Sequence, residues 1–346
     1  MKKLFLLLWI IPFITQAQVI SINQDNTNLI YANSINIEDI KKHVYTLASD
    51  SMQGRETGTI GQQMAAQYIA NHFRKIGIPP YKRKTYYQEF TVKSKKHSCK
   101  CSTCDADAIN RRKNPSEISG ENVLGYIEGT DLKKELIVIT AHYDHLGAHD
   151  GEIFNGADDD ASGTSAALEI AQAFMDAKNN GDGPRRSILI MAVSGEEKGL
   201  LGSKYYTDNP IYPLKNTIAN LNIDMIGRID EYHEDGDYVY LIGSDKLSTE
   251  LHNISEEVNN KYYNINLDYT FNSEDDPNRY YYRSDHYNFA KNNIPVIFYF
   301  NGIHEDYHQP TDTPDKLNYE KIEKITRLVF LTAWELANRD DRPKLD

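Results

Sequence analysis

Four short apolar runs, each ending in or followed by acidic residues or histidine, restrict the fold of this sequence more than any other feature. They lie at 135–140, 187–194, 218–224 and 293–300 and read ELIVIT, SILIMAVS, IANLNID and NIPVIFYF. Apolar runs of this length are typical of strands that are buried on both faces. Buried strands need cover from neighbouring elements, so the runs predict a sheet between layers of helices.

Helical segments separate these strands along the chain. Apolar residues recur at intervals of three and four at 37–49 and 59–78, where Gly77 is a typical stop signal. Further helices are predicted at 161–177, 246–262 and 319–337, and further strands at 86–92, 122–129 and 237–243. The alternation favours an α/β fold with a mixed, mostly parallel central sheet flanked by helices on both faces, which is a three-layer sandwich.

The first eighteen residues, MKKLFLLLWIIPFITQAQ, have the pattern of a signal peptide. Lys2 and Lys3 precede an apolar run from Leu4 to Ile14, and a small-residue cleavage pattern follows it. The run is shorter than the roughly 20 residues that a membrane span needs. We therefore expect residues 1–17 to be removed and the protein to be exported, periplasmic or extracellular, without a membrane span.

Charge and composition indicate how the chain is divided into domains and argue against one class of partner. Of 38 basic residues, removal of the two leader lysines leaves 36, against 50 acidic residues. Nucleic acid binding needs a basic face, so no nucleic-acid partner is expected. After an extended polar lead-in at 18–36, we expect one domain at 37–338 and a tail at 339–346. The sequence leaves the oligomeric state open.

All three cysteines, Cys99, Cys101 and Cys104, lie in a polar insertion near 94–118. An odd number of cysteines in an exported protein leaves at least one thiol without an intramolecular partner. Together with His97, these thiols could bind a soft metal. The alternative, which we favour, is a surface loop with at most a local disulfide.

The residues at the ends of the four apolar runs have the chemistry of a metal site. They are His142, Asp144, Glu196, Glu197, Asp224 and His308. Ligands bind at the carboxyl ends of parallel strands in such folds. Carboxylates buried together without cations repel one another and lose their hydration. Asp, Glu and His without Cys suit a catalytic zinc site, and the surplus of carboxylates suggests two cations with a shared carboxylate.

Asp159 is the best candidate for the shared carboxylate. It lies in the segment NGADDDASG, directly before the helix predicted at 161–177. Glycines permit an irregular backbone there, and the positive end of the helix helps to keep the acids ionised. The neighbouring Asp158 and Asp160 are interpreted as acids that cap this helix.

The adjacent pair Glu196 and Glu197 can serve one site only where the strand is broken, because successive strand residues point to opposite faces. Gly195, Gly199 and Gly202 make such a break plausible. One glutamate can then bind a cation while its neighbour takes a proton from an activated water molecule.

Other polar and aromatic residues receive structural interpretations. Surface or supporting positions are expected for His145, His149 and His304, and a solvated helix face for Glu169. The tyrosines at 280–282 either line the pocket for the first side chain of a substrate or pack a loop on the surface. The sequence does not decide between these two alternatives.

Five segments resemble the signature segments of a known family: TAHYDHLG, NGADDDASGTSAA, SGEEKGLLGS, NIDMIGR and YHQPTDTPDKL. They are similar, in the same order, to the secreted zinc aminopeptidases of metallopeptidase family twenty-eight. This superfamily also includes glutamate carboxypeptidases, glutaminyl cyclases and the inactive ectodomain of the transferrin receptor. The segment SDSMQGRETGTIGQQMAAQYIANHFRKIGI resembles the lead-in of bacterial members, so the resemblance spans residues 37–337.

The resemblance implies a zinc aminopeptidase fold with two Zn²⁺ per chain. It implies that His142, Asp159 and Asp224 hold one ion and that Asp159, Glu197 and His308 hold the other. Asp160 stands where many family members have Asn, which changes the local charge but not this ligand set. The cysteine insertion has no counterpart in the resemblance.

The resemblance also implies roles in catalysis. Glu196 matches the general base, Tyr307 matches a tyrosine that stabilises the oxyanion, and Asp144 matches a carboxylate that orients the imidazole of His142. The run from Arg283 to His286 resembles a segment near the site, on the substrate side or in support of the ligands.

These roles predict an exopeptidase that removes N-terminal residues from peptides through a hydroxide activated by two zinc ions. A single-zinc glutaminyl cyclase is one alternative, against which the presence of both His142 and Asp159 speaks. A carboxypeptidase for acidic residues would need a basic pocket that the sequence does not locate. A binding ectodomain without catalysis is disfavoured because all five ligands and Glu196 are present.

Overall fold

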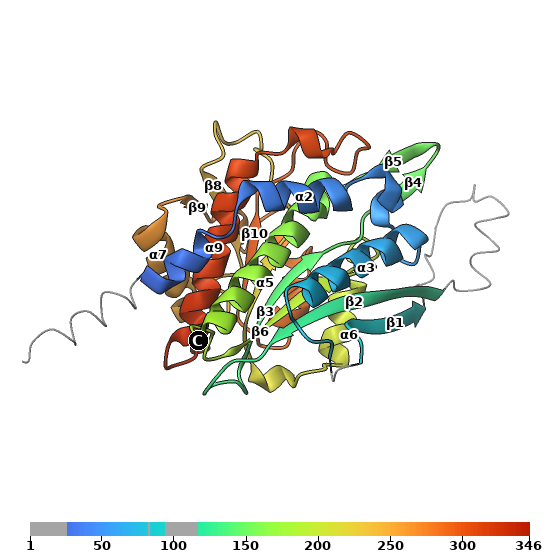
Figure 1. Ribbon diagram of the computed structural model, residues 1–346. Coiled ribbons are helices and arrows are strands. Elements are labelled where there is room, and N and C mark those ends of the chain that lie inside the picture. Colours follow the sequence, from blue (N-terminus) through green and yellow to red (C-terminus); the bar gives the residue numbers. More distant parts are fainter. Residues whose placement is uncertain (1–25, 82–83, 94–116) are drawn as a thin grey trace, which may run out of the picture.

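The computed structural model describes residues 26–81, 84–93 and 117–346 (Figure 1). The expected signal peptide and the three cysteines lie outside the described residues. Within the described part of the chain, no helix is long and apolar enough to cross a membrane.

The centre of the molecule is an eight-stranded sheet. Its strands are β1 (Tyr87–Lys93), β2 (Glu117–Ile127), β3 (Leu136–His142), β6 (Ser187–Val193), β7 (Thr217–Ile223), β8 (Tyr238–Ile242), β9 (Asn266–Asp268) and β10 (Val296–Phe300). Their order in the sheet is β1-β2-β6-β3-β7-β10-β8-β9. The pairs β1–β2, β2–β6 and β10–β8 are antiparallel and the other four are parallel. The predicted mixed, mostly parallel sheet is confirmed.

The four strands predicted to carry the site are neighbours at the middle of this sheet. They lie in the order β6-β3-β7-β10 and run parallel to one another. Every residue of these strands is buried, which explains their apolar sequences. Because the strands share one direction, their carboxyl ends meet at one edge of the sheet.

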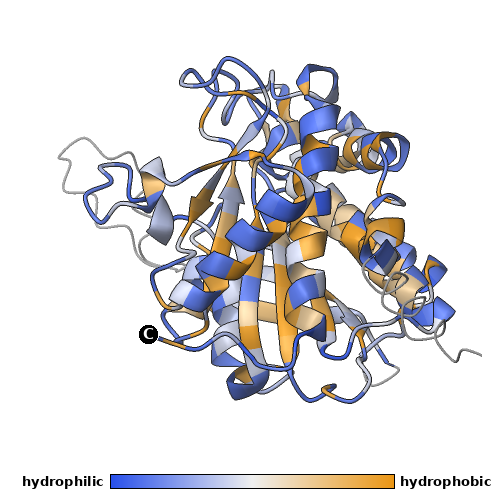
Figure 2. Ribbon diagram, turned by 90° about the vertical axis from the view of Figure 1, so that its left-hand side faces the viewer, coloured by the Kyte–Doolittle hydropathy of each residue, from blue (hydrophilic) through white to orange (hydrophobic). Residues whose placement is uncertain are grey.

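Helices cover both faces of the sheet and complete the three layers (Figure 1). They are α2 (Ile37–Leu47), α3 (Ile60–Lys75), α5 (Gly163–Asn180), α6 (Leu201–Asp208), α7 (Thr249–Tyr262), α8 (His286–Ala290) and α9 (Tyr319–Asn338). The apolar core on one face includes residues of α2, α3, α5, α7 and α9. A second core on the other face includes residues of α6 and α8. Figure 2 shows the apolar residues gathered on the central strands between the helices.

Four of these helices begin at a capping side chain, which accepts a hydrogen bond from a main-chain N–H of the first turn. The capping residues are Asn36 for α2, Thr59 for α3, Ser248 for α7 and Asn318 for α9. The starts of the helices are therefore encoded locally, while their apolar sides are fixed by the sheet that they cover.

The lead-in departs from the expectation. Its described part is helical at 26–32 instead of extended. Tyr31 and Ile35 are buried, and the ring of Tyr31 stacks on that of Trp334 in α9, with 5.8 Å between centroids. Burial of these apolar residues stabilises a helix that the polar composition of 18–36 does not reveal. The small antiparallel hairpin of β4 (Gly147–His149) and β5 (Glu152–Phe154) was also not predicted.

Candidate metal centre

Asp159 lies between two clusters of the predicted residues. Its Oδ1 is 3.1 Å from Nε2 of His142, and its Oδ2 is 3.1 Å from Nε2 of His308. Nε2 of His142 is also 3.4 Å from Oδ1 of Asp224, and Nε2 of His308 is 3.3 Å from Oε2 of Glu197. The structure therefore brings all five residues together, with His142 and Asp224 on one side of Asp159 and Glu197 and His308 on the other.

These residues come from the edge of the sheet where the four strands end. His142 is the last residue of β3, Asp224 directly follows β7, and Glu197 lies in the loop after β6. His308 lies in the loop after β10, and Asp159 lies in the irregular segment η2 (Ala157–Ser162) before α5. The convergence predicted from the strand ends is thus observed.

The spacing and the chemistry of these donor atoms fit zinc. Bonds of about 2.0–2.1 Å place neighbouring donors of a tetrahedral zinc site about 3.3 Å apart. The four distances above, 3.1–3.4 Å, match this separation. The two oxygens of Asp159 face different clusters, as a carboxylate shared by two cations requires. The residues present could hold two zinc ions, and the role of each as a ligand stays a prediction.

Protons can occupy these imidazoles when cations are absent. Burial lowers the pKa of His308, but contacts with Asp159 and Glu197 outweigh it and raise this pKa to about 10. Burial also lowers the pKa of His142, but Asp224 and Asp159 raise it well above its ordinary value. Metal binding would therefore release protons from the site.

Asp144 is fully buried two residues after His142. Its main-chain oxygen lies 3.1 Å from Nδ1 of His142, whereas its Oδ1 is 3.9 Å away. An imidazole that donates through Nδ1 leaves Nε2 free to bind a cation. The Asp144 carboxylate accepts instead from the hydroxyl of Thr57 at 2.7 Å and from the main-chain N–H of Glu196 at 3.2 Å. It thus joins the ends of β3 and β6.

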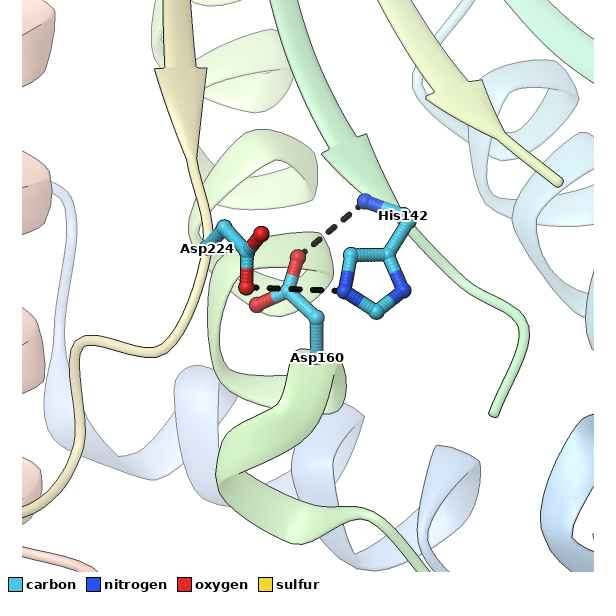
Figure 3. A group of neighbouring side chains, drawn as sticks. All are labelled: His142, Asp160 and Asp224. Carbon is cyan, nitrogen blue, oxygen red and sulfur yellow. Dashed lines mark hydrogen bonds and ion pairs between the residues drawn. The ribbon is translucent and has the colours of Figure 1, made fainter. Parts of the chain in front are cut away.

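Asp160 lies beside His142 and Asp224, with its carboxylate close to both (Figure 3). Its Oδ2 accepts from the main-chain N–H of His142 at 3.1 Å. Its Oδ1 accepts from the main-chain N–H groups of Gly163 at 2.9 Å and Met225 at 3.1 Å. Three N–H donors thus occupy the Asp160 carboxylate, which caps the first residue of α5 as predicted.

Two sequence interpretations near the site were wrong. Asp158 does not cap α5: its Oδ1 accepts from Gly227 N–H at 2.6 Å, and its Oδ2 lies 3.1 Å from Nε2 of His304. Glu169 is not solvated, because only 4% of it is exposed and its Oε1 lies 3.4 Å from Nε2 of His43. His149 is exposed on the β4–β5 hairpin, in agreement with the expectation.

Arg55 supports the site and was missed in the sequence. It is fully buried at the end of η1 (Asp50–Arg55). Its guanidinium donates to four main-chain oxygens at 2.6–2.9 Å, those of Leu47, Tyr143, Asn155 and Gly156. These bonds tie α2 to the ends of both segments that carry His142 and Asp159. The partners of Arg55 are main-chain oxygens, so no pattern of side chains in the sequence signals this role.

A pocket of about 390 Å³ opens beside the two clusters. Glu196 and Tyr307, the predicted catalytic residues, both line it. Its apolar wall is formed by Met225, Tyr280, Phe298, Phe300 and Ile303. Of the three tyrosines left open by the sequence, Tyr280 lines this pocket, while Tyr281 and Tyr282 line a separate depression.

The family follows from a match that covers more than half of the chain. Residues 122–333 match the model of Peptidase family M28. The chain belongs to peptidase family M28. This membership confirms the prediction that the chain belongs to a family of zinc peptidases.

Two relatives of this M28 peptidase are informative. Aminopeptidase YwaD of Bacillus subtilis is 26% identical over 289 residues, which cover 78% of this chain and 54% of the relative. A probable zinc metalloprotease of Pyrenophora tritici-repentis is 37% identical over 123 residues, which cover 33% of this chain and 23% of the relative. The chain therefore spans about half of the first relative and about a quarter of the second.

Solved structures share the fold of this M28 peptidase. The LapA aminopeptidase of Legionella pneumophila has a TM-score of 0.68 at 22% identity, covering 92% of this chain and 76% of that one. BSAP, a zinc aminopeptidase from Bacillus subtilis, has a TM-score of 0.65 at 16% identity, covering 88% of this chain and 96% of that one. Porphyromonas gingivalis glutaminyl cyclase has a TM-score of 0.63 at 19% identity, covering 86% of this chain and 98% of that one. At these identities the likeness establishes the fold alone.

Proposed function

We propose that this M28 peptidase is a two-zinc aminopeptidase that removes N-terminal residues from peptides. The observation that carries the proposal is Asp159, whose two oxygens face separate imidazole and carboxylate clusters beside a small pocket. His142 and Asp224 would complete one zinc position, and Glu197 and His308 the other. Bound zinc would polarise the scissile carbonyl and lower the pKa of a water molecule.

Glu196 would accept the proton of the attacking water and return it to the leaving amine. Burial raises the pKa of its carboxyl well above the ordinary value; His142 opposes this shift, while Glu197 and Asp224 add to it. A general base must lie within reach of the water that it deprotonates, and Glu196 lines the pocket beside both clusters. Among the described residues, no imidazole forms an ion pair with its carboxylate, which leaves it available.

Tyr307 would donate a hydrogen bond to the oxyanion. Its ring stacks on the ring of His308, with 3.8 Å between centroids, which holds the phenol at the pocket. Burial raises its pKa, and the nearby carboxylates of Asp159 and Glu197 raise it further. The hydroxyl therefore stays protonated and remains a donor at neutral pH.

The pocket fits one end of a peptide. It is small and is lined by His142, Asp159 and His308 as well as by apolar side chains, which favours one bound side chain beside the clusters over a long segment. Its apolar wall favours large apolar N-terminal residues. We also propose that the enzyme acts outside the cytoplasm on peptides, on the strength of the leader pattern at 1–17.

Arg283 favours a second candidate, a carboxypeptidase for acidic residues. It also lines the pocket, and its guanidinium lies 5.0 Å from the centroid of the Tyr280 ring. Arg283 is thus a basic group of the kind that the sequence could not locate. It could bind the carboxylate of a substrate directly.

A panel of substrates separates these functions. Amino-acid anilides and dipeptides would be assayed with free and acetylated N-termini, with and without a chelator. An aminopeptidase cleaves free N-termini with large apolar residues, loses activity with chelator, and spares the acetylated substrates. Release of C-terminal Glu from acetylated peptides would support the second candidate, and cyclisation of N-terminal Gln would show a glutaminyl cyclase. Elemental analysis would count the metal ions per chain, with two expected.

A further inference from the structure

His145 is a buried histidine beside the Asp159–Glu197 half of the site that the proposed function does not use. Its side chain is fully buried. Its Nδ1 lies 3.0 Å from Oε1 of Glu197 and 3.7 Å from Oδ2 of Asp159. Its ring also approaches that of His308 edge to face, with 5.8 Å between centroids.

The ring of His145 is fixed in this position. Its main-chain N–H donates to the main-chain oxygen of Arg55 at 3.3 Å. The ring packs so closely on Gly156 that a Cβ atom at this glycine would lie 2.5 Å from Cγ of His145. Gly156 therefore provides the space that the imidazole occupies.

The polar atoms of this contact are arranged as ligands are. Among the described residues, neither ring nitrogen of His145 makes an aligned hydrogen bond, and neither does Oε1 of Glu197. Nδ1 and Oε1 are nonetheless 3.0 Å apart. A nitrogen and an oxygen at this distance, with no N–H directed from one to the other, are placed like two ligand atoms that bind the same cation. A cation would satisfy two buried atoms that otherwise lack partners.

We propose that His145 is a further nitrogen ligand of the cation position formed by Asp159, Glu197 and His308. The inference rests on the proposed two-zinc function and adds an asymmetry to it. This position would have two imidazoles, whereas the position at His142 would have one. Zinc binds imidazole well, so the position with two imidazoles would hold its ion more tightly and lose it last during chelation.

The variant His145→Gln separates a ligand from a hydrogen-bond donor. The amide of Gln can still donate to Glu197 but is a poor zinc ligand. His149→Gln makes the same change on the exposed β4–β5 hairpin and serves as the matched control. Both variants and the wild type would be stripped of metal and titrated with Zn²⁺ in competition with a chromophoric chelator. We expect one of two affinities to fall by more than about 100-fold in His145→Gln, beyond the loss of about 10- to 100-fold typical of a residue that only hydrogen-bonds a ligand, and neither to change in the control.

A second measurement needs no variant and applies if His145→Gln does not fold. Wild-type protein loaded with two Co²⁺ ions would show one paramagnetically shifted ring N–H signal for each coordinated imidazole. We expect three such signals, for His142, His145 and His308. Two signals would overturn the inference.

The outcomes distinguish this inference from the proposed function. Wild-type protein that binds no zinc would contradict both. Wild-type protein that binds two zinc ions, with His145→Gln losing less than about 100-fold in either affinity, would leave the function standing and show that His145 is no ligand.

Discussion

Glu196 and Glu197 are neighbours in the sequence but differ in their surroundings. Gly195, with φ of 76°, breaks the strand direction after β6 and allows both side chains to reach the site. Glu197 faces the imidazoles of His145 and His308, whereas Glu196 lines the pocket. One residue is thus placed to hold a cation and the other to move a proton.

The variant Glu196→Gln should retain both metal ions and lose most of its activity. The amide keeps the size of the side chain but cannot accept a proton from water. We expect kcat to fall by about 10²- to 10⁴-fold, measured with an amino-acid anilide, with unchanged metal content. Glu152→Gln on the exposed hairpin should leave kcat unchanged. An undiminished rate in Glu196→Gln would rule out this residue as the base.

Arg55→Lys should weaken the fold although it keeps the charge. Lys offers a single ammonium in place of the planar group that donates to four main-chain oxygens, so buried carbonyls would lose their donors. We expect a loss of about 3 kcal/mol in the free energy of unfolding, measured with urea. Arg74→Lys, on the exposed side of α3, should change it by less than about 0.5 kcal/mol. Equal stability of the two variants would contradict the role of Arg55.

The sequence predicted the convergence of His142, Asp159 and Asp224 because each follows or precedes a regular element whose direction the pattern reveals. It did not predict the contributions of Arg55 and His145. Arg55 acts through main-chain oxygens, which every residue has, so its sequence neighbours carry no matching signal. His145 faces the site only because Gly156 leaves room for its ring, and such a contact between distant residues has no periodicity.

At the scale of elements, α2, α3 and α5 lie on one face of the sheet and enclose a buried polar cluster. His43 Nδ1 lies 2.7 Å from the hydroxyl of Tyr68, and its Nε2 lies 3.4 Å from Oε1 of Glu169. The ring of His72 packs edge to face on that of His43 at 4.7 Å. Burial, aided by Asp39, raises the pKa of Glu169 to about 8. Burial lowers the pKa of His43 to about 4.

Glu169→Gln should stabilise the protein at pH 8 and not at pH 4. The folded pKa of Glu169 is above its unfolded value, so the folded state binds more protons between these two values. The wild type therefore loses stability as the pH rises from about 4.5 to about 8, on the order of 1 kcal/mol per pH unit, and Gln removes this loss. Urea unfolding at both pH values measures the difference. Glu152→Gln on the hairpin is the control, and an effect independent of pH would contradict the argument.

The regular elements were largely predictable, and their pairing was not. The runs at β3, β6, β7 and β10 are buried on both faces, so their composition alone indicates strands. The antiparallel position of β1 beside β2 depends on contacts between strands and has no local signal. The helical period of α5 was predicted correctly, but it does not say which of its sides a neighbour covers. Glu169 was misplaced for this reason.

At the scale of the whole molecule, zinc should stabilise the folded chain. The five predicted ligands extend from His142 to His308 and meet only in the folded state, so binding favours that state. Free zinc at 100 times its dissociation constant would add about 2.7 kcal/mol per independent site. We expect a chelator to lower the thermal midpoint and added zinc to restore it, measured by calorimetry. A thermal midpoint that does not change when the chelator is added would contradict a metal site within the fold.

His308→Asn is the matched variant for this measurement. His308 has φ of 57°, a left-handed conformation that Asn tolerates better than most residues. The variant should therefore fold and show a smaller zinc-dependent rise of the midpoint than the wild type, because one position lacks its imidazole. An unchanged rise would show that His308 contributes no binding energy.

The place of β10 in the sheet has a consequence for folding during synthesis of the chain. β10 lies between β7 and β8, although the ribosome makes it after both. The loop that follows β10 carries Tyr307 and His308, so a nascent polypeptide lacks both residues until β10 itself has been made. The sheet edge therefore cannot gather all five predicted ligands before β10 has been inserted between β7 and β8.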